Sequence, residues 1–213
     1  MKIQPPQLAV ERLVPADPGR LVRDEEVTGC AFSGPMPPVL HEHAEIAECS
    51  FAGASFSGCS LRGVRFSDVV FRNCDLSNAD LHGAVLQRVE FLACKLLGTD
   101  FAETVLRHVR FDRCPSALAS FAAMRSRGLR FDECALQGAF FADCRFEQTA
   151  FAGCDLTEAD FSGTRLAGLS LADSDIRGLR VRAAESFELQ GAKIARWQAL
   201  DLVRLLGVEV AEE

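Results

Sequence analysis

The chain has 213 residues, of which 48% are hydrophobic and 25% charged, and its formal net charge is −7 at pH 7. This apolar content is enough to bury a continuous core. No apolar run approaches the 18 residues of a membrane-spanning helix, and no charged segment followed by an apolar one opens the chain. These features argue against a membrane-embedded or secreted protein, so we expect a soluble, cytoplasmic one.

Residues 1–45 are predicted to form an N-terminal capping segment with a proline-rich loop. Seven of the eight prolines lie before residue 39, and proline cannot donate a hydrogen bond to a neighbouring strand. Val27 and Phe32 hint at repeat units in a different register from those that follow. His41 and His43 lie in the loop, but two histidines without a third placed ligand are typical of a solvated loop, so no metal site is predicted.

Residues 46–183 follow a five-residue repeat. In steps of five from position 46 to position 181 there are 28 positions, and all but Ser116 and Ser126 carry Ile, Leu, Val or Phe. An uncharged, mostly small residue stands two positions before each of them, and all eleven glycines of this stretch stand two positions after. Neither a helix nor a flat strand places every fifth side chain on one face. The chain must therefore turn a corner in each unit, and such units can bury their apolar side only by stacking.

A longer period of twenty residues is superimposed on the repeat. Two columns of phenylalanine have this spacing: Phe51, Phe71, Phe91, Phe111, Phe131 and Phe151 in one, and Phe101, Phe121, Phe141 and Phe161 in the other. Four units therefore make one coil, and 28 units make seven coils. At the usual strand spacing of about 4.8 Å, the stack would be roughly 34 Å long.

Three units show the repeat most plainly. Residues 74–78 read Cys-Asp-Leu-Ser-Asn, residues 79–83 read Ala-Asp-Leu-His-Gly, and residues 159–163 read Ala-Asp-Phe-Ser-Gly. This pattern resembles that of the pentapeptide-repeat proteins, and the resemblance covers residues 46–181. It implies an all-β fold, a right-handed quadrilateral β-helix with four units to a coil. We expect about seven coils or more, with the N-terminal cap at one end and a C-terminal α-helix at the other.

The nine cysteines follow the repeat. Eight of them occupy the position two residues before the central apolar residue, and Cys30 stands likewise before Phe32. Five of them, from Cys74 to Cys154, are spaced by twenty residues and would stack at about 4.8 Å, beyond the roughly 3.8 Å between the Cβ atoms of a disulfide. We therefore predict reduced core residues.

The segment from residue 114 to residue 126 contains both breaks in the apolar column, together with Pro115. Phe121 keeps the phase of the repeat. A distorted coil would explain this pattern, and so would a projecting loop of ten residues, because such a loop also preserves the phase.

Residues 184–213 leave the repeat. Helical spacing over residues 194–206 predicts a helix closed by Gly207, and residues 208–210 alternate like a short strand. This tail resembles the C-terminal end of the Qnr quinolone-resistance proteins and of MfpA. The resemblance implies a homodimer whose interface is formed by Trp197, Leu200, Leu202, Leu205 and Leu206. The alternative is a helix that only seals the last coil of a monomer.

The sequence offers no motif for catalysis. The four histidines are scattered, and His82 and His108 stand in solvent-facing columns. The glycines recur as turns of the repeat and do not gather before a helix, as a phosphate-binding loop requires. We therefore predict a non-enzymatic protein with no catalytic residues, cofactor, metal or small-molecule substrate.

Charge is divided unevenly among the four sides of the predicted coil. Two adjacent faces, centred on positions 56, 76 and so on and on positions 61, 81 and so on, net −4; we call them the acidic faces. Their carboxylates are Asp75, Asp80, Asp100, Glu103, Asp143, Asp155, Glu158, Asp160 and Asp175. The face centred on positions 46, 66 and so on nets +3, and we call it the arginine face.

The resemblance implies a rod that imitates duplex DNA, binds DNA gyrase and topoisomerase IV, and protects them from a poison such as a quinolone or a gyrase-targeting natural product. The acidic faces would meet the basic DNA groove of the enzyme, with no direct contact between this protein and nucleic acid. Three other interpretations stay open. The carboxylates are ordinary solvated surface, the protein is a β-helical interaction scaffold without a topoisomerase role, or the arginine face contacts an acidic partner.

Overall fold

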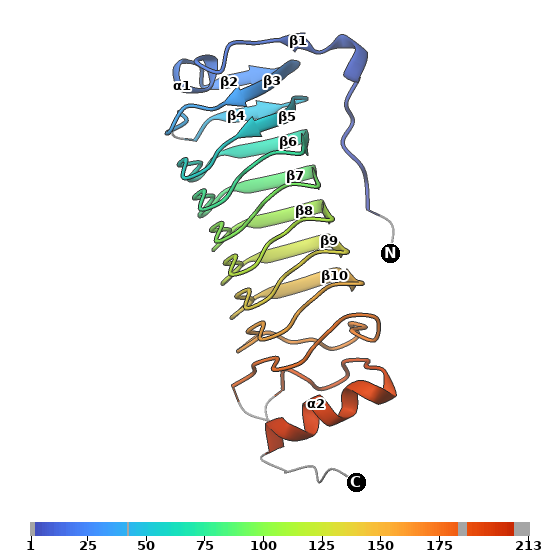
Figure 1. Ribbon diagram of the computed structural model, residues 1–213. Helices are drawn as coiled ribbons and strands as arrows, with labels where there is room; N and C mark the ends of the chain where they lie inside the picture. The colour runs from blue at the N-terminus through green and yellow to red at the C-terminus, as the bar shows by residue number, and fades with distance from the viewer. Residues whose placement is uncertain (1–2, 42, 183–186, 207–213) are drawn as a thin grey trace.

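The computed structural model describes residues 3–41, 43–182 and 187–206, and it shows a parallel β-solenoid whose coils stack along one axis (Figure 1). The strands of the regular part are β6 (Arg65–Arg72), β7 (Val85–Leu92), β8 (Val105–Asp112), β9 (Arg125–Asp132) and β10 (Arg145–Ala152). Each pairs in parallel with the next, residue by residue at an offset of twenty, so that Phe71 faces Phe91 and Phe91 faces Phe111. The right-handed quadrilateral β-helix and its twenty-residue coil are thereby confirmed.

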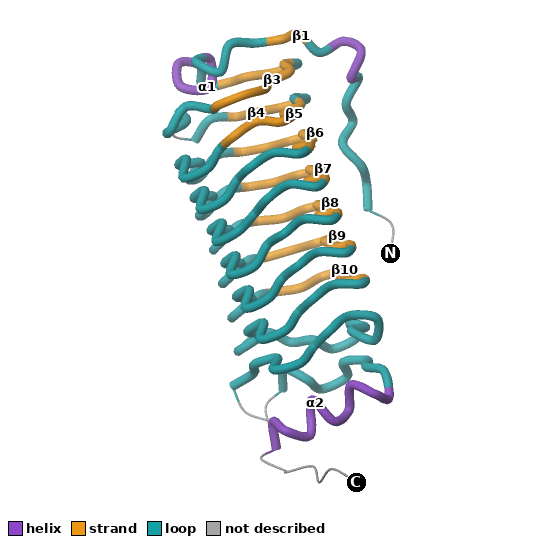
Figure 2. The backbone as a smooth tube through the Cα atoms, in the orientation of Figure 1, coloured by secondary structure: helices purple, strands orange, loops and turns teal. Residues whose placement is uncertain are grey.

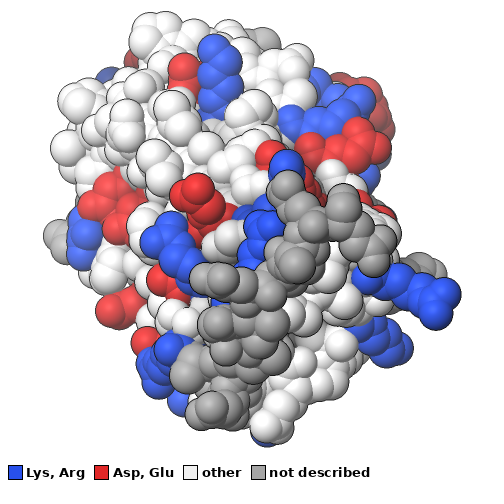
Figure 3. Space-filling view, turned by 60° about the horizontal axis from the view of Figure 1, so that its bottom comes forward, with Lys and Arg blue, Asp and Glu red and all other residues white. Residues whose placement is uncertain are grey.

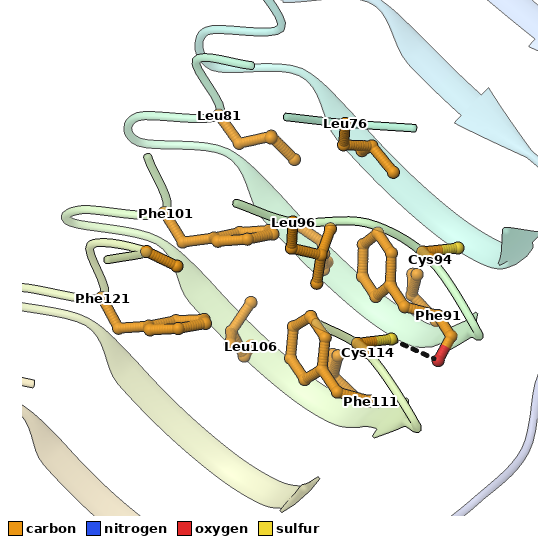
Figure 4. Close-up of a cluster of buried hydrophobic side chains, with 14 of the residues drawn as sticks. Leu76, Leu81, Phe91, Cys94, Leu96, Phe101, Leu106, Phe111, Cys114 and Phe121 are labelled. Atoms are coloured by element: carbon orange, nitrogen blue, oxygen red, sulfur yellow. Dashed lines mark hydrogen bonds between the residues drawn. The ribbon is translucent and has the colours of Figure 1, made fainter. Parts of the chain in front are cut away.

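Stacked phenylalanine rings fill the interior. The rings of Phe71, Phe91 and Phe111 lie nearly parallel with centroids 4.8 Å apart, which is the spacing of the coils themselves. The second column meets the first edge to face, as in the pair Phe111 and Phe121 at 5.9 Å and 82° (Figure 4). Both arrangements suit the quadrupole of an aromatic ring. The core is therefore a continuous column of side chains, each layer supplied by one coil.

Cysteine and threonine side chains tie the coils together. All nine cysteines are free and buried, as predicted. The Cys114 thiol donates to the carbonyl oxygen of Phe91 in the preceding coil at 3.4 Å (Figure 4), and the Thr99 hydroxyl donates to the carbonyl of Leu76 at 2.8 Å. The small inward position thus supplies a hydrogen-bond donor from one coil to the backbone of the next.

The corners of the coils use left-handed backbone. All eleven glycines of the repeat have positive φ, which is the conformation that favours glycine. Other residues occupy the equivalent corner elsewhere, for example Arg88 (φ 52°), Glu103 (φ 58°) and His108 (φ 55°). Glycine therefore marks the turn but is not required at it.

The segment around Pro115 is a regular coil, neither a distorted one nor a projecting loop. Pro115 pairs with Ala135 and keeps the register. Ser116 is fully buried, and its hydroxyl donates to the carbonyl of Cys114, while the hydroxyl of Ser126 lies 3.0 Å from that of Thr149. Each serine replaces an apolar side chain in the core and is tolerated because its oxygen finds a partner.

The first coil begins earlier than residue 46. Strand β2 (Glu26–Thr28) pairs with β4 (Glu45–Ala47), and β3 (Cys30–Pro35) pairs with β5 (Ser50–Ser55). Val27 faces Ile46 and Phe32 faces Phe51, at an offset of nineteen in place of twenty, which agrees with the different register that these two residues indicated.

The N-terminal residues first run along the side of the rod and then cap the first coil. The capping elements are η1 (Val10–Arg12), β1 (Val14–Pro15) and α1 (Arg20–Arg23), and Leu21 of α1 is fully buried. Residues 3–9, here called the N-terminal strap, run beside the coils (Figures 1 and 2). The backbone N–H of Gln7 donates to the carboxylate of Asp68 at 2.8 Å and holds the strap against β6.

The last coils carry isolated bridges in place of strands, for example between Asp155 and Asp175 and between Ser170 and Lys193. A short helical segment then lies across the end of the solenoid: η2 (Arg196–Gln198), α2 (Ala199–Val203) and η3 (Arg204–Leu206) (Figure 2). The predicted cap at Gly207 and the strand over residues 208–210 lie outside the described residues. No helix in the described part of the chain is long and apolar enough to cross a bilayer.

Candidate interaction surfaces

Six aspartates of the acidic faces occupy the same place in the repeat, immediately before a central apolar residue. They are Asp75, Asp80, Asp100, Asp155, Asp160 and Asp175. Each is half-buried, and in each one carboxylate oxygen accepts the backbone N–H two residues further on, at 2.8–3.1 Å. This Asx turn stabilises the corner of the coil. These carboxylates therefore have a structural role in addition to any role in binding.

The other three carboxylates of the acidic faces are freer. Glu103, Asp143 and Glu158 are exposed and stand at left-handed corners. Asp143 forms an ion pair with Arg182 at 2.6 Å, and Glu103 lies 3.7 Å from the imidazole of His82. Of the nine, these three are the exposed ones, whereas the other six are half-buried.

The pKa values of three aspartates are lowered by their partners. Hydrogen bonds from Ser77 lower the pKa of Asp75, and those from Arg177 lower the pKa of Asp175. Partial burial raises the pKa of Asp80, but hydrogen bonds from the Arg62 guanidinium and the His82 amide outweigh it and leave the pKa below its ordinary value. These side chains are therefore charged at neutral pH.

The carboxylates gather in two groups along the rod. The first acidic cluster is Asp75, Asp80, Asp100 and Glu103; the second is Asp143, Asp155, Glu158, Asp160 and Asp175. On adjacent coils, a parallel β-bridge of the backbone joins Asp80 to Asp100, and another joins Asp155 to Asp175. Three coil spacings separate Asp100 from Asp160, or about 14 Å.

Three exposed apolar side chains lie on the acidic faces near the two acidic clusters, and the sequence analysis did not identify them. Leu97, Leu118 and Phe140 are 50%, 59% and 40% exposed, and we call them the apolar window. Phe140 stands in the column between Asp100 and Asp160. The signal was present in the sequence, because all three are apolar residues in solvent-facing columns, where polar residues are expected.

The predicted dimer residues do not share one environment. Trp197 and Leu200 are 59% and 55% exposed, whereas Leu202 packs against the core and Leu205 is half-buried. The side chain of Leu206 lies outside the described residues.

Gln198 anchors the C-terminal helical segment, a role that sequence reasoning missed. It is fully buried, and its amide donates to the carbonyls of Leu171 and Ser174 at 2.8 and 2.6 Å. Its amide oxygen accepts the backbone N–H of Ala195. The segment is therefore fixed to the last coil through Gln198, while Trp197 and Leu200 face outward.

A parallel β-solenoid with five-residue sides, a phenylalanine core and charged outer faces defines a class of elongated repeat proteins with large lateral surfaces. Two family models match the sequence. One, described as a pentapeptide repeat region, covers residues 44–121, and the other, described as pentapeptide repeats in 9 copies, covers residues 131–175. Together they span more than half of the chain, which therefore belongs to the pentapeptide-repeat family.

The chain is also similar, at low sequence identity, to several solved structures. Full-length QnrB1, a plasmid-mediated fluoroquinolone resistance protein, is 18% identical over 91% of this chain and 95% of its own, with a TM-score of 0.42. HetL, a pentapeptide repeat protein involved in heterocyst differentiation regulation in the cyanobacterium Nostoc, is 16% identical over 87% of this chain and 90% of its own, with a TM-score of 0.31. Rfr23 from the cyanobacterium Cyanothece is 12% identical over 82% and 95%, with a TM-score of 0.30. No curated protein sequence matches the chain.

Proposed function

We propose that this chain is a non-enzymatic, cytoplasmic protein that binds bacterial DNA gyrase or topoisomerase IV through its acidic faces and protects the enzyme from a poison. The observation that supports this most is the pair of acidic clusters on two adjacent sides of the rod, where carboxylates stack on neighbouring coils. The resemblance of the C-terminal tail to Qnr and MfpA proteins points to the same partner and to a dimer.

The net charge of the acidic faces is small compared with that of duplex DNA of the same length. Duplex DNA carries one charge per about 1.7 Å of axis, or roughly 20 charges over the length of this solenoid. The two acidic faces net only −4. Both signs also mix around the C-terminal end of the rod (Figure 3). Contact would therefore be made at the two clusters and not along a uniformly anionic rod.

A gyrase supercoiling assay with and without ciprofloxacin tests the proposal. Wild-type protein at micromolar concentration is expected either to inhibit supercoiling or to relieve inhibition by the drug. The test variant is Asp80→Asn, Asp100→Asn and Asp160→Asn, because asparagine still accepts the turn hydrogen bond while the charge is lost. A control set removes three carboxylates from a different side of the rod: Glu90→Gln, Glu133→Gln and Asp173→Asn.

The outcomes separate the candidates. Loss of the effect in the first set alone supports contact through the acidic faces, and equal loss in both sets contradicts it. No effect of the wild-type protein contradicts the topoisomerase role itself.

The second candidate, an interaction scaffold without a topoisomerase role, is favoured by the apolar window. Solvent-exposed Leu118 and Phe140 on a repeat protein are typical of a protein-binding surface. Leu118→Ser with Phe140→Ser provides the corresponding variant. Unchanged gyrase activity of this variant, together with lost binding to a different partner, would favour the scaffold.

A further inference from the structure

A groove lies on the arginine face, beside the N-terminal strap. Its volume is about 800 Å³, and it is lined by residues of β7 to β10 and by Gln4 of the strap. Five arginines line it: Arg88 is paired with Asp68, and the other four are Arg107, Arg125, Arg127 and Arg145. Glu147 is the one carboxylate among the lining residues.

The parallel register places these four arginines in like-charged pairs. Arg107 faces Arg127 across β8 and β9, and Arg125 faces Arg145 across β9 and β10. Adjacent strands are about 4.8 Å apart, and like charges directly opposite one another destabilise a sheet. Arg125 and Arg127 both lie on β9, so the four arginines form a staggered row of positive charge across the three strands β8, β9 and β10.

None of these four arginines forms an ion pair within the described part of the chain. Neighbouring positions on the same face behave differently, since Arg88 is paired with Asp68 and Arg65 lies 3.8 Å from Glu45. Glu147 faces Arg127 across β9 and β10 and offsets one of the four charges, so an excess of three positive charges remains for a bound anion to neutralise.

The ring of His108 and the side chains of two glutamines line the same groove. The Nδ1 atom of His108 is buried and has no hydrogen-bond partner among the described residues. Gly128 leaves room for this ring, because a Cβ at that position would lie 2.8 Å from Nδ1. The amides of Gln87 and Gln148 complete a lining rich in hydrogen-bond donors.

The strap makes the groove a bounded site. The carboxylate of Asp68 accepts one hydrogen bond from the backbone N–H of Gln7 and two from the guanidinium of Arg88. It therefore fixes the strap to the sheet next to the arginines. The volume of the groove lies within the range of about 300–1,000 Å³ that is usual for small-molecule sites.

We propose that the arginine groove binds a small anion with two or more phosphate groups. Guanidinium groups bind phosphate through paired, charge-assisted hydrogen bonds. Neighbouring arginines of the row are about 4.8 Å apart across strands and roughly 6.6 Å apart along β9, which suits adjacent phosphates of one ligand. This site lies on a different side of the rod from the acidic clusters, and it does not depend on the topoisomerase proposal.

Calorimetry and thermal unfolding with inorganic tripolyphosphate test this site, with sodium chloride at matched ionic strength as the salt control. The test variant is Arg107→Gln with Arg127→Gln. The matched control is Arg72→Gln with Arg113→Gln, two exposed arginines on a different side of the coil. We expect tripolyphosphate to raise the Tm of the wild type and of the control, and to bind the test variant at least about tenfold more weakly. Without ligand, the test variant should melt higher by about 1–2 °C, because a like-charged pair is removed.

Three results would overturn the proposal. The first is no Tm increase in the wild type beyond that caused by sodium chloride. The second is equal weakening in both double variants. The third is tighter binding of polyglutamate or duplex DNA than of tripolyphosphate at the same ionic strength, which would assign the groove to an acidic protein or to nucleic acid.

Discussion

At the scale of single residues, Asp80 combines a structural contact with the binding role proposed for it. Asp80 accepts the amide of His82 at 2.9 Å and pairs with Arg62 at 2.9 Å, yet it also belongs to the first acidic cluster. Its carboxylate is half-buried, so part of it remains in contact with solvent. A substitution that tests binding must therefore preserve the turn.

This arrangement predicts a dependence of stability on pH. The pKa values of Asp75, Asp80 and Asp175 are lower in the folded chain than their ordinary value. They therefore contribute stability above the unfolded-state pKa of about 3.9, and this contribution is lost as pH falls through the folded-state values. Urea unfolding at pH 6 and at pH 3 should show a lower midpoint at pH 3.

Replacing these three aspartates with asparagine should reduce the difference between the two midpoints. Glu133→Gln, an exposed carboxylate on another face, is the control and should leave it unchanged. An undiminished difference in the triple variant would show that other groups cause the acid sensitivity.

At the scale of the elements, each coil is stabilised by the coils above and below it. Phe111 stacks on Phe91 at 4.8 Å and on Phe131 at 4.7 Å, so its ring contacts the layer above and the layer below. A cavity in the middle of the column thus removes contacts from both neighbours.

Phe111→Ala is expected to lower the free energy of unfolding by about 3–5 kcal/mol. The matched control is Phe140→Ala, the same substitution at a residue that is 40% exposed in an outward column, and it should cost far less. Chemical denaturation of both variants measures the difference. Equal costs would mean that the phenylalanine column is not the principal source of stability.

At the scale of the whole molecule, the rod has two different ends. One end is closed by β1 and α1, with Leu21 buried beneath them. The other is covered by the helical segment that Gln198 anchors, where Trp197 and Leu200 remain exposed. The proposed dimer would bury these two side chains and produce a rod with its solenoids pointing away from each other.

Substituting Trp197→Glu with Leu200→Glu should convert a dimer to a monomer, because two charges would be placed in an apolar interface. Light scattering after size-exclusion chromatography measures the mass. Phe187→Glu, at another exposed apolar residue near this end, is the control and should remain dimeric. A monomeric wild type at micromolar concentration would instead assign the segment to sealing the last coil.

The sequence by itself determined the solenoid, the inward and outward columns, the reduced cysteines, and the net charges of the acidic faces and of the arginine face. It could do so because a five-residue period with uncharged inner positions leaves stacking as the one way to bury the apolar side. Only the tertiary structure decided that the coil through Pro115 is regular, that the first coil is offset by nineteen residues, and how far each side chain of the apolar window is exposed. It also decided where the strap binds, since Gln7 and Asp68 are 61 positions apart in the chain, and it showed that Gln198 fixes the C-terminal helical segment to the last coil. These contacts join residues outside the repeat to residues within it, and a periodic pattern contains no information about where a non-periodic segment will bind.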